Sequence, residues 1–130
     1  MRTHVTVLGW AHIFVNLIHL MVAALAAVGI TFLDGVIALT GLVHALPISM
    51  TVGVFVVLVA AVVYIPGMIV GWGLLNYASW ARILGILVSI FDLLHFRASW
   101  PLFILGIYGL IVLLNAQTAA LFEERGAGSY

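Results

Sequence analysis

Charged residues are scarce in this sequence. Its 130 residues include four Lys or Arg and four Asp or Glu, which is 6% of the chain, while 66% of the residues are apolar. A soluble domain is usually about a quarter charged. Eight ionised side chains cannot cover a water-exposed surface. The sequence therefore predicts that lipid is the solvent for most of the chain. The formal net charge is zero and no basic patch occurs, so nothing indicates nucleic-acid binding.

Cysteine is absent. Its absence excludes disulfides, thiolate metal sites, iron–sulfur clusters and palmitoylation, and it leaves the redox compartment open. Motifs for covalent catalysis and phosphate binding are also missing, because no serine lies in a G-x-S-x-G sequence and no glycine-rich phosphate loop occurs. We therefore expect no catalytic residues, no metal site and no enzymatic activity from this chain alone.

Long apolar stretches, by contrast, fill the sequence. A helix needs about 20 apolar residues to cross a bilayer, at a rise of about 1.5 Å per residue. The first stretch follows Arg2 and is longer than the apolar part of a secretory signal, so we expect a retained membrane helix. Two glycines and Asp34 interrupt it in GITFLDG, and Pro47 divides the next apolar run.

The sequence thus predicts an all-α fold, an integral membrane four-helix bundle in one transmembrane domain over residues 1–130. A short interfacial or kinked helical segment, residues 36–46, is expected before the second span, and a polar tail is expected at the end. The expected spans are roughly 5–28, 49–75, 79–96 and 101–122, and the tail is 123–130.

Arginine positions predict the orientation. Four spans place both termini on one side of the membrane, together with Arg2, Arg82 and Arg125, while Arg97 falls on the other side. By the positive-inside rule, both termini are expected in the cytoplasm.

The stretch GWAHIFVNLIHL, residues 9–20, places polar side chains inside the first apolar run. On a helix, His12, Asn16 and His19 fall within roughly 60° of arc. Exposing these groups to hydrocarbon would be costly, so this face is expected to contact protein or trapped water.

The third span has a matching feature in SIFDLLHFR, where Asp92 and His95 share a helical face. Counted from Trp80, they lie roughly 18 and 22 Å along their helix, and His19 lies roughly 21 Å from Val5 along its own. If the first and third helices touch, these groups meet at a similar depth. The sequence therefore predicts one intramembrane polar cluster, made of His12, Asn16, His19, Asp92 and His95.

Three roles are open for this cluster. The groups could bond to one another and fix the register of the helices, a modest stabilisation of about 0.6 kcal/mol per contact. His19 and His95 could instead be axial ligands of a haem or chlorophyll held between helices. In the third role, Asp92 and His19, with His12, form a proton or ion pathway.

A close-packing signal lies in PGMIVGWG, where Gly67 and Gly71 have the G-x-x-x-G spacing. Small residues four apart let two helices approach closely. The spacing predicts a packed interface, but it leaves open whether the partner helix belongs to the same chain.

The sequence GWGLLNYASWARILGILVSIF, followed by WPLFILGIYGLIVLLNAQTAALF, resembles a pattern in small, uncharacterised bacterial four-helix integral membrane proteins. The resemblance covers residues 72–122. It rests on Trp80-Ala81-Arg82 opening the third span, and on Pro101 before Gly106-Ile107-Tyr108. It implies a four-helix bundle in a bacterial inner membrane and no particular activity.

Together these features predict a non-catalytic accessory or scaffold subunit of a larger bacterial membrane complex, or a small homo-oligomer. The expected partners are the lipid bilayer and other membrane chains or copies of this one. The alternatives are a haem or chlorophyll carrier ligated by His19 and His95, and a proton or ion pathway through Asp92 and His19.

Overall fold

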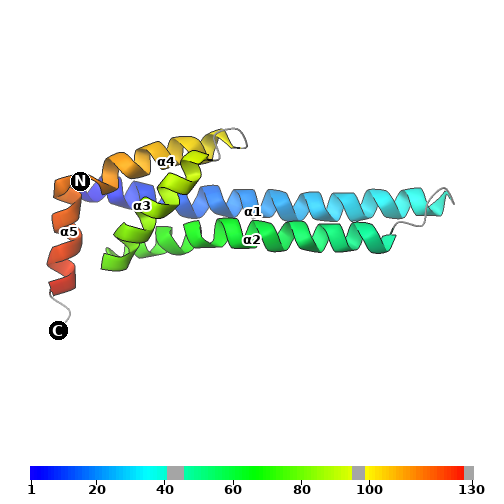
Figure 1. Cartoon of the computed structure of the whole chain (residues 1–130), viewed down its shortest axis with the longest axis horizontal. Helices are drawn as coiled ribbons and strands as arrows, with labels where there is room; N and C mark the ends of the chain where they lie inside the picture. The colour runs from blue at the N-terminus through cyan, green and yellow to red at the C-terminus, as the bar shows by residue number, and fades with distance from the viewer. Residues whose placement is uncertain (41–45, 95–98, 128–130) are drawn as a thin grey trace. The chain divides into compact units, whose positions relative to one another are not determined.

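The computed structural model describes residues 1–40, 46–94 and 99–127, and within these ranges the chain is helical, with no strand. This confirms the all-α prediction. Figure 1 shows the helices, which are α1 (Arg2–Leu39), α2 (Leu46–Leu75), α3 (Ser79–Leu94), α4 (Trp100–Leu113) and α5 (Ala116–Ala127).

Helix α1 continues through residues 29–35, where the sequence predicts an interruption. Glycine inside a helix costs only about 1 kcal/mol relative to alanine, and strongly apolar residues flank both glycines. The Thr31 hydroxyl also donates to the Ala27 carbonyl at 3.0 Å, so its polar group is satisfied within the helix. Residues 36–39 therefore belong to α1 and not to a separate interfacial segment, while residues 41–45 lie outside the described part.

The expected fourth span, 101–122, is divided into α4 and α5. Asn115 begins the second helix, because its side-chain Oδ1 accepts from the Gln117 N–H at 2.9 Å, as a helix-capping residue does. The axes of Trp100–Leu113 and Ala116–Glu123 differ by 72°. Helix α5 then runs on to Ala127, so much of the expected polar tail is helical.

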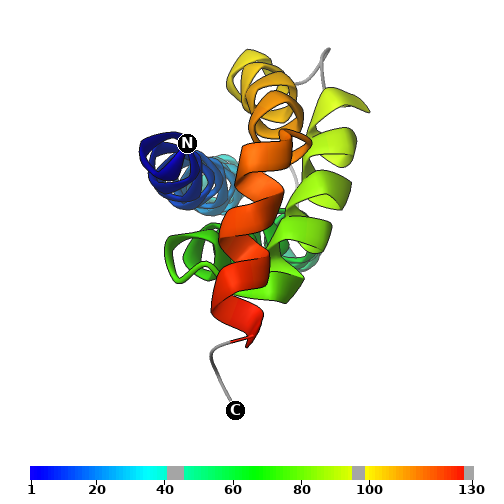
Figure 2. The same ribbon diagram turned by 90° about the vertical axis from the view of Figure 1, so that its left-hand side faces the viewer.

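Two compact units make up the chain. The first unit contains Met1–Asn16 and Pro66–Tyr130, and the second contains Leu17–Ile65. In the first unit, α3 packs along α4, and α5 packs against both of them (Figure 2). Its buried core includes Val5, Leu8, Val70, Leu74, Leu105, Val112, Leu113 and Phe122.

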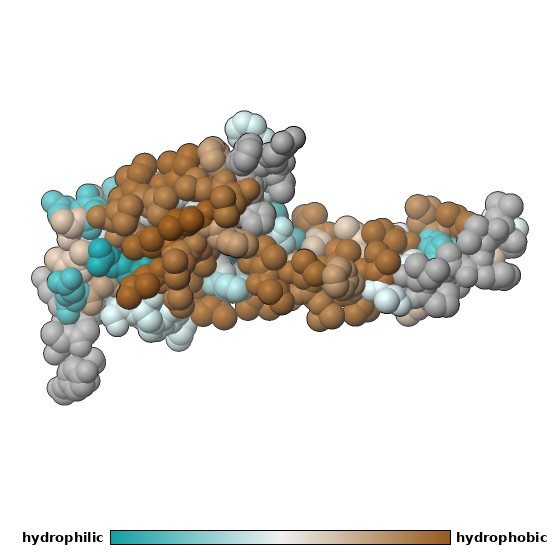
Figure 3. All heavy atoms as spheres, in the orientation of Figure 1, coloured by the Kyte–Doolittle hydropathy of each residue, from teal (hydrophilic) through white to brown (hydrophobic). Residues whose placement is uncertain are grey.

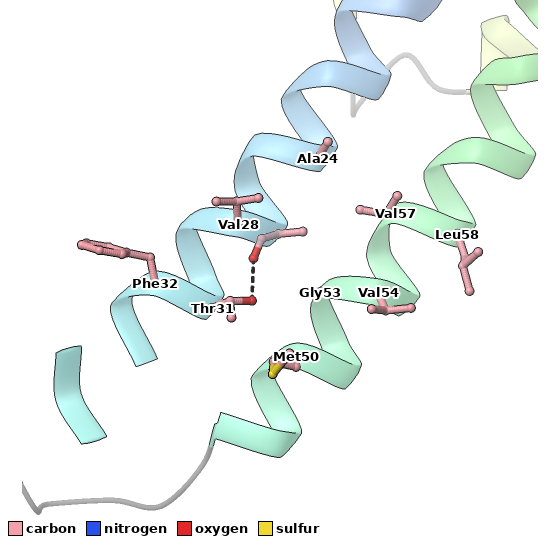
Figure 4. A pocket seen from close by; sticks show the side chains of 10 residues that line it. Ala24, Val28, Thr31, Phe32, Met50, Gly53, Val54, Val57 and Leu58 are labelled. Carbon is pink, nitrogen blue, oxygen red and sulfur yellow. Dashed lines mark hydrogen bonds between the residues drawn. The ribbon is translucent and has the colours of Figure 1, made fainter. Parts of the chain in front are cut away.

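The second unit is a hairpin made of the later part of α1 and the earlier part of α2. Ala27 is buried opposite Gly53, where an added Cβ would lie 3.4 Å from the Ala27 carbonyl oxygen. Small residues thus bring the two helices close together. A groove of about 590 Å³ runs along this hairpin, with Thr31 and Gly53 among its lining residues (Figure 4).

Helices α1 and α2 are apolar enough to cross a membrane. Among the described residues, Arg2–Leu39 and Ser49–Leu75 each have the required length and hydropathy, and α4 with the start of α5 would make a third, bent crossing. Apolar residues cover most of the surface seen in Figure 3. A bilayer would keep these apolar side chains out of water.

Candidate functional site: a buried polar cluster

Four polar side chains are buried in the first unit, on α1 and α3. We call His12, Asn16, Ser89 and Asp92 the polar cluster. His12 and Ser89 are fully buried, and Asn16 and Asp92 are 2% and 6% exposed. Buried polar groups are rare in apolar helices, because each must find a partner away from water.

His12 and Asp92 form the centre of the polar cluster. The His12 Nδ1 lies 3.1 Å from the Leu8 carbonyl, and its Nε2 lies 3.8 Å from Oδ2 of Asp92. The second distance is within reach of an ion pair but is longer than a hydrogen bond.

The contact with the Leu8 carbonyl shows which nitrogen of the His12 imidazole carries a hydrogen. A carbonyl can only accept, so Nδ1 carries a hydrogen, and Nε2 of a neutral His12 presents a lone pair to Asp92. An ionised carboxylate facing that lone pair would be repelled. A proton on either group would remove this repulsion, as imidazolium with carboxylate or as imidazole with carboxylic acid.

Asn16 and two glycines hold α1 against α2 beside this pair. The Asn16 Nδ2 donates to the His12 carbonyl at 2.8 Å. A Cβ on Gly67 would lie 2.6 Å from the Asn16 Cγ, and a Cβ on Gly71 would lie 2.6 Å from the Gly9 carbonyl oxygen. Such distances are too short for a side chain, so Gly67 and Gly71 pack against α1 of the same chain.

Helix α4 closes the other side of the polar cluster. A Cβ on Gly106 would lie 2.6 Å from the Ser89 carbonyl oxygen and 3.1 Å from the Asp92 Cβ. A Cβ on Gly109 would lie 3.1 Å from the Ser89 Cβ and 3.6 Å from Leu8. The glycine face of α4 thus lies directly over Ser89 and Asp92, and it brings α3 toward the turn of α1 that carries Leu8 and His12.

The structure describes one of the two other residues predicted for the site. His19 is half-buried in the second unit, where its ring centroid lies 5.3 Å from that of Tyr64. His95 lies outside the described residues. The prediction that His19 and His95 bind a tetrapyrrole therefore stays a prediction, and an absorption spectrum of the purified protein tests it.

The structure gives the Trp-Ala-Arg sequence two packing roles that the sequence reasoning missed. Ala81 is fully buried, and a Cβ on Gly73 would lie 2.6 Å from its side chain. Arg82 donates through Nε to the Leu113 carbonyl at 3.2 Å, at the end of α4. A cation near the C-terminus of a helix is favourable, because the last carbonyls there lack helical partners. The sequence signal for the Arg82 contact was an arginine next to an apolar run, where a charged side chain needs a polar partner.

A tyrosine from the α2–α3 turn also anchors the start of α1. Tyr77 has a positive φ of 53°, unusual for a bulky side chain, and its hydroxyl donates to the Arg2 carbonyl at 3.2 Å. The hydroxyl also lies 3.4 Å from Oγ1 of Thr6. The turn therefore holds the N-terminal end of α1 in place.

No protein-family model, curated protein or solved structure matches this chain. The class that the fold defines is an all-helical protein with helices long and apolar enough to cross a membrane.

Proposed function

We propose that this chain is a non-catalytic integral membrane protein that acts as an accessory or scaffold subunit of a larger bacterial inner-membrane complex, or as a small homo-oligomer. The main support is the apolar length of α1. The polar cluster serves this role by holding α1 and α3 together, which keeps the outer apolar faces in a fixed arrangement.

Helix α1 is longer than a bilayer can cover. Its 38 residues have a contour length of about 57 Å at 1.5 Å per residue, against a hydrocarbon core about 30 Å thick. Even a tilt of about 40° accommodates only about 26 residues. Because polar residues open α1, the part inside the hydrocarbon core begins near Val5 and ends near residue 30, so about nine residues remain at the C-terminal end.

That end carries large exposed apolar side chains. Phe32 is 73% exposed, Leu33 is 60% exposed and Leu39 is 88% exposed. Side chains beyond the acyl chains would meet water unless another protein surface covers them. Figure 4 shows Phe32 pointing away from α2, so its own hairpin does not cover it. We infer that a partner chain does.

The four-span arrangement with cytoplasmic termini is part of this proposal. The described part of α3 has 16 residues and α4 has 14, or about 24 and 21 Å, each less than the thickness of the hydrocarbon core. A bilayer thins around short spans at a modest cost. In this arrangement the bend at Asn115 places α5 at the cytoplasmic surface.

The particle mass in a mild detergent tests the proposal. One chain has a mass of 14.0 kDa, and we expect particles that contain several copies or additional chains. The double variant Phe32→Ser/Leu39→Ser should release the chain from its partners, because it removes apolar contacts at the surplus end of α1. Met21→Ser, at a 55% exposed position, is the matched control and should leave the assembly intact. A stable lone monomer in both mild detergent and nanodiscs would contradict the proposal.

A second candidate function is proton transfer through the polar cluster. Its support is the buried His12–Asp92 pair, an imidazole and a carboxyl group 3.8 Å apart, two groups that can take up and release protons. Asp92→Asn keeps the shape but removes the acid. In proteoliposomes, a proton flux abolished by this substitution supports the role, and a flux that is absent or unchanged excludes it.

A further inference from the structure

A second groove lies in the first unit, between α1 and α4. Its volume is about 440 Å³, and its lining is almost entirely apolar. Val7, Ala11 and Val15 contribute one wall, and Pro101, Ile104 and Leu105 contribute most of the other. The residues of the first wall are four apart, so they form a straight stripe along α1.

A hydrogen-bonded polar pair stands at one end of this groove. The His4 Nδ1 lies 2.9 Å from the hydroxyl of Tyr108, and Tyr108 itself lines the groove. His4 precedes Val7 by one turn of α1, so the polar pair lies toward the N-terminal end of the stripe. The opposite end is lined by Trp100, which is 74% exposed. The groove is therefore amphipathic along its length.

We propose that this groove binds one acyl chain of a phospholipid, with the lipid phosphate and ester groups at the His4–Tyr108 pair. The wall from Val7 to Val15 is about 12 Å long, and His4 to Val15 is about 16 Å. One leaflet of the hydrocarbon core is about 15 Å deep, so the groove has the length of a single acyl chain.

This chemistry distinguishes the groove from the larger one on the second unit. The polar groups that line that groove, the Thr31 hydroxyl and the Ala27 carbonyl, are bonded to each other within α1. In the groove of the first unit, the Tyr108 hydroxyl and the His4 imidazole provide a donor and an acceptor for an oxygen-rich headgroup. The site is thus specific for an amphiphile with one polar end.

Lipid retention during purification tests this inference. The protein is purified in a mild detergent, washed extensively, and examined by native mass spectrometry and by lipid extraction. We expect about one phospholipid per chain. Ala11→Phe fills the groove and should lower the retained lipid about fivefold. Ala26→Phe, at an exposed position that lines neither groove, is the matched control and should retain the lipid.

Two further variants keep the test decisive if Ala11→Phe fails to fold. Val7→Phe narrows the groove from its half-exposed edge without changing the core, and it should also lower retention. Tyr108→Phe removes the hydroxyl at the headgroup end and should weaken binding while leaving the groove open. Recovery of an isoprenoid quinone in place of a phospholipid would overturn the proposal. So would equal lipid retention by all variants, or no retained lipid in the unmodified protein.

Discussion

Replacing His12 by alanine removes the imidazole that lies beside Asp92. The side chains of both residues are more than 90% buried, and their nearest charged atoms are 3.8 Å apart. Interhelical polar contacts in membrane proteins average about 0.6 kcal/mol and reach about 1.7 kcal/mol. Because this pair is enclosed and leaves a polar group in an apolar interior when broken, we expect a coupling free energy near the upper end, about 1.5 kcal/mol.

A double-mutant cycle measures this coupling. His12→Ala, Asp92→Ala and the double variant are unfolded by titration with a denaturing detergent in mixed micelles, and the loss of helix is followed. Each single change should destabilise the protein by about 2 kcal/mol, and the double change should cost less than their sum. The control cycle pairs His12→Ala with Asp34→Ala, because Asp34 lies 22 residues further along α1, or about 33 Å. A His12–Asp92 coupling no larger than the control coupling would refute the paired arrangement.

Two further predictions concern packing and topology. Gly71→Ala should destabilise the protein by about 2 kcal/mol, because its Cβ would lie 2.6 Å from a backbone oxygen of α1. Gly29→Ala has open space around the new Cβ and should be neutral or stabilising by up to about 1 kcal/mol in the same unfolding titration. Equal losses for the two variants would contradict the close approach of α1 and α2. Because the chain has no cysteine, single introduced cysteines report topology without background. A membrane-impermeant maleimide applied to intact cells should label Trp100→Cys, whereas Thr3→Cys and Glu123→Cys should react only after permeabilisation. Labelling of Thr3→Cys in intact cells would reject the proposed orientation.

The sequence was sufficient to predict the helical class, because uninterrupted apolar runs allow few other folds. It was less informative about helix ends. Asn115 lies inside an apolar run that is long enough to be predicted as one span. Only its side-chain bond to the Gln117 N–H shows that a helix begins there. The glycines at 29–35 look like an interruption, yet the flanking residues keep α1 helical. In the first case one side-chain contact outweighs the composition of the segment, and in the second the flanking residues outweigh the glycines.

The polar cluster shows the same limit. Helical spacing placed His12 and Asn16 on one face, and both side chains are buried in the structure. The depth comparison pairs His19 with Asp92; these residues lie in different units, so that pairing stays a prediction, and the contact described for Asp92 is with His12. Counting residues from each span end assumes helices that are parallel and start at one level. The level of contact depends on glycines such as Gly106, whose lack of a side chain sets how closely α4 approaches α3.

The distance in sequence between His12 and Asp92 has a consequence for biosynthesis. At about 5–20 residues per second, a ribosome adds the intervening 80 residues in roughly 4–16 s. Throughout that interval the imidazole in α1 has no carboxyl group to meet, so the nascent helix must keep its polar side away from acyl chains. If the chain spans a membrane, the translocon provides water beside lipid, so α1 can keep His12 hydrated there until α3 has been synthesised.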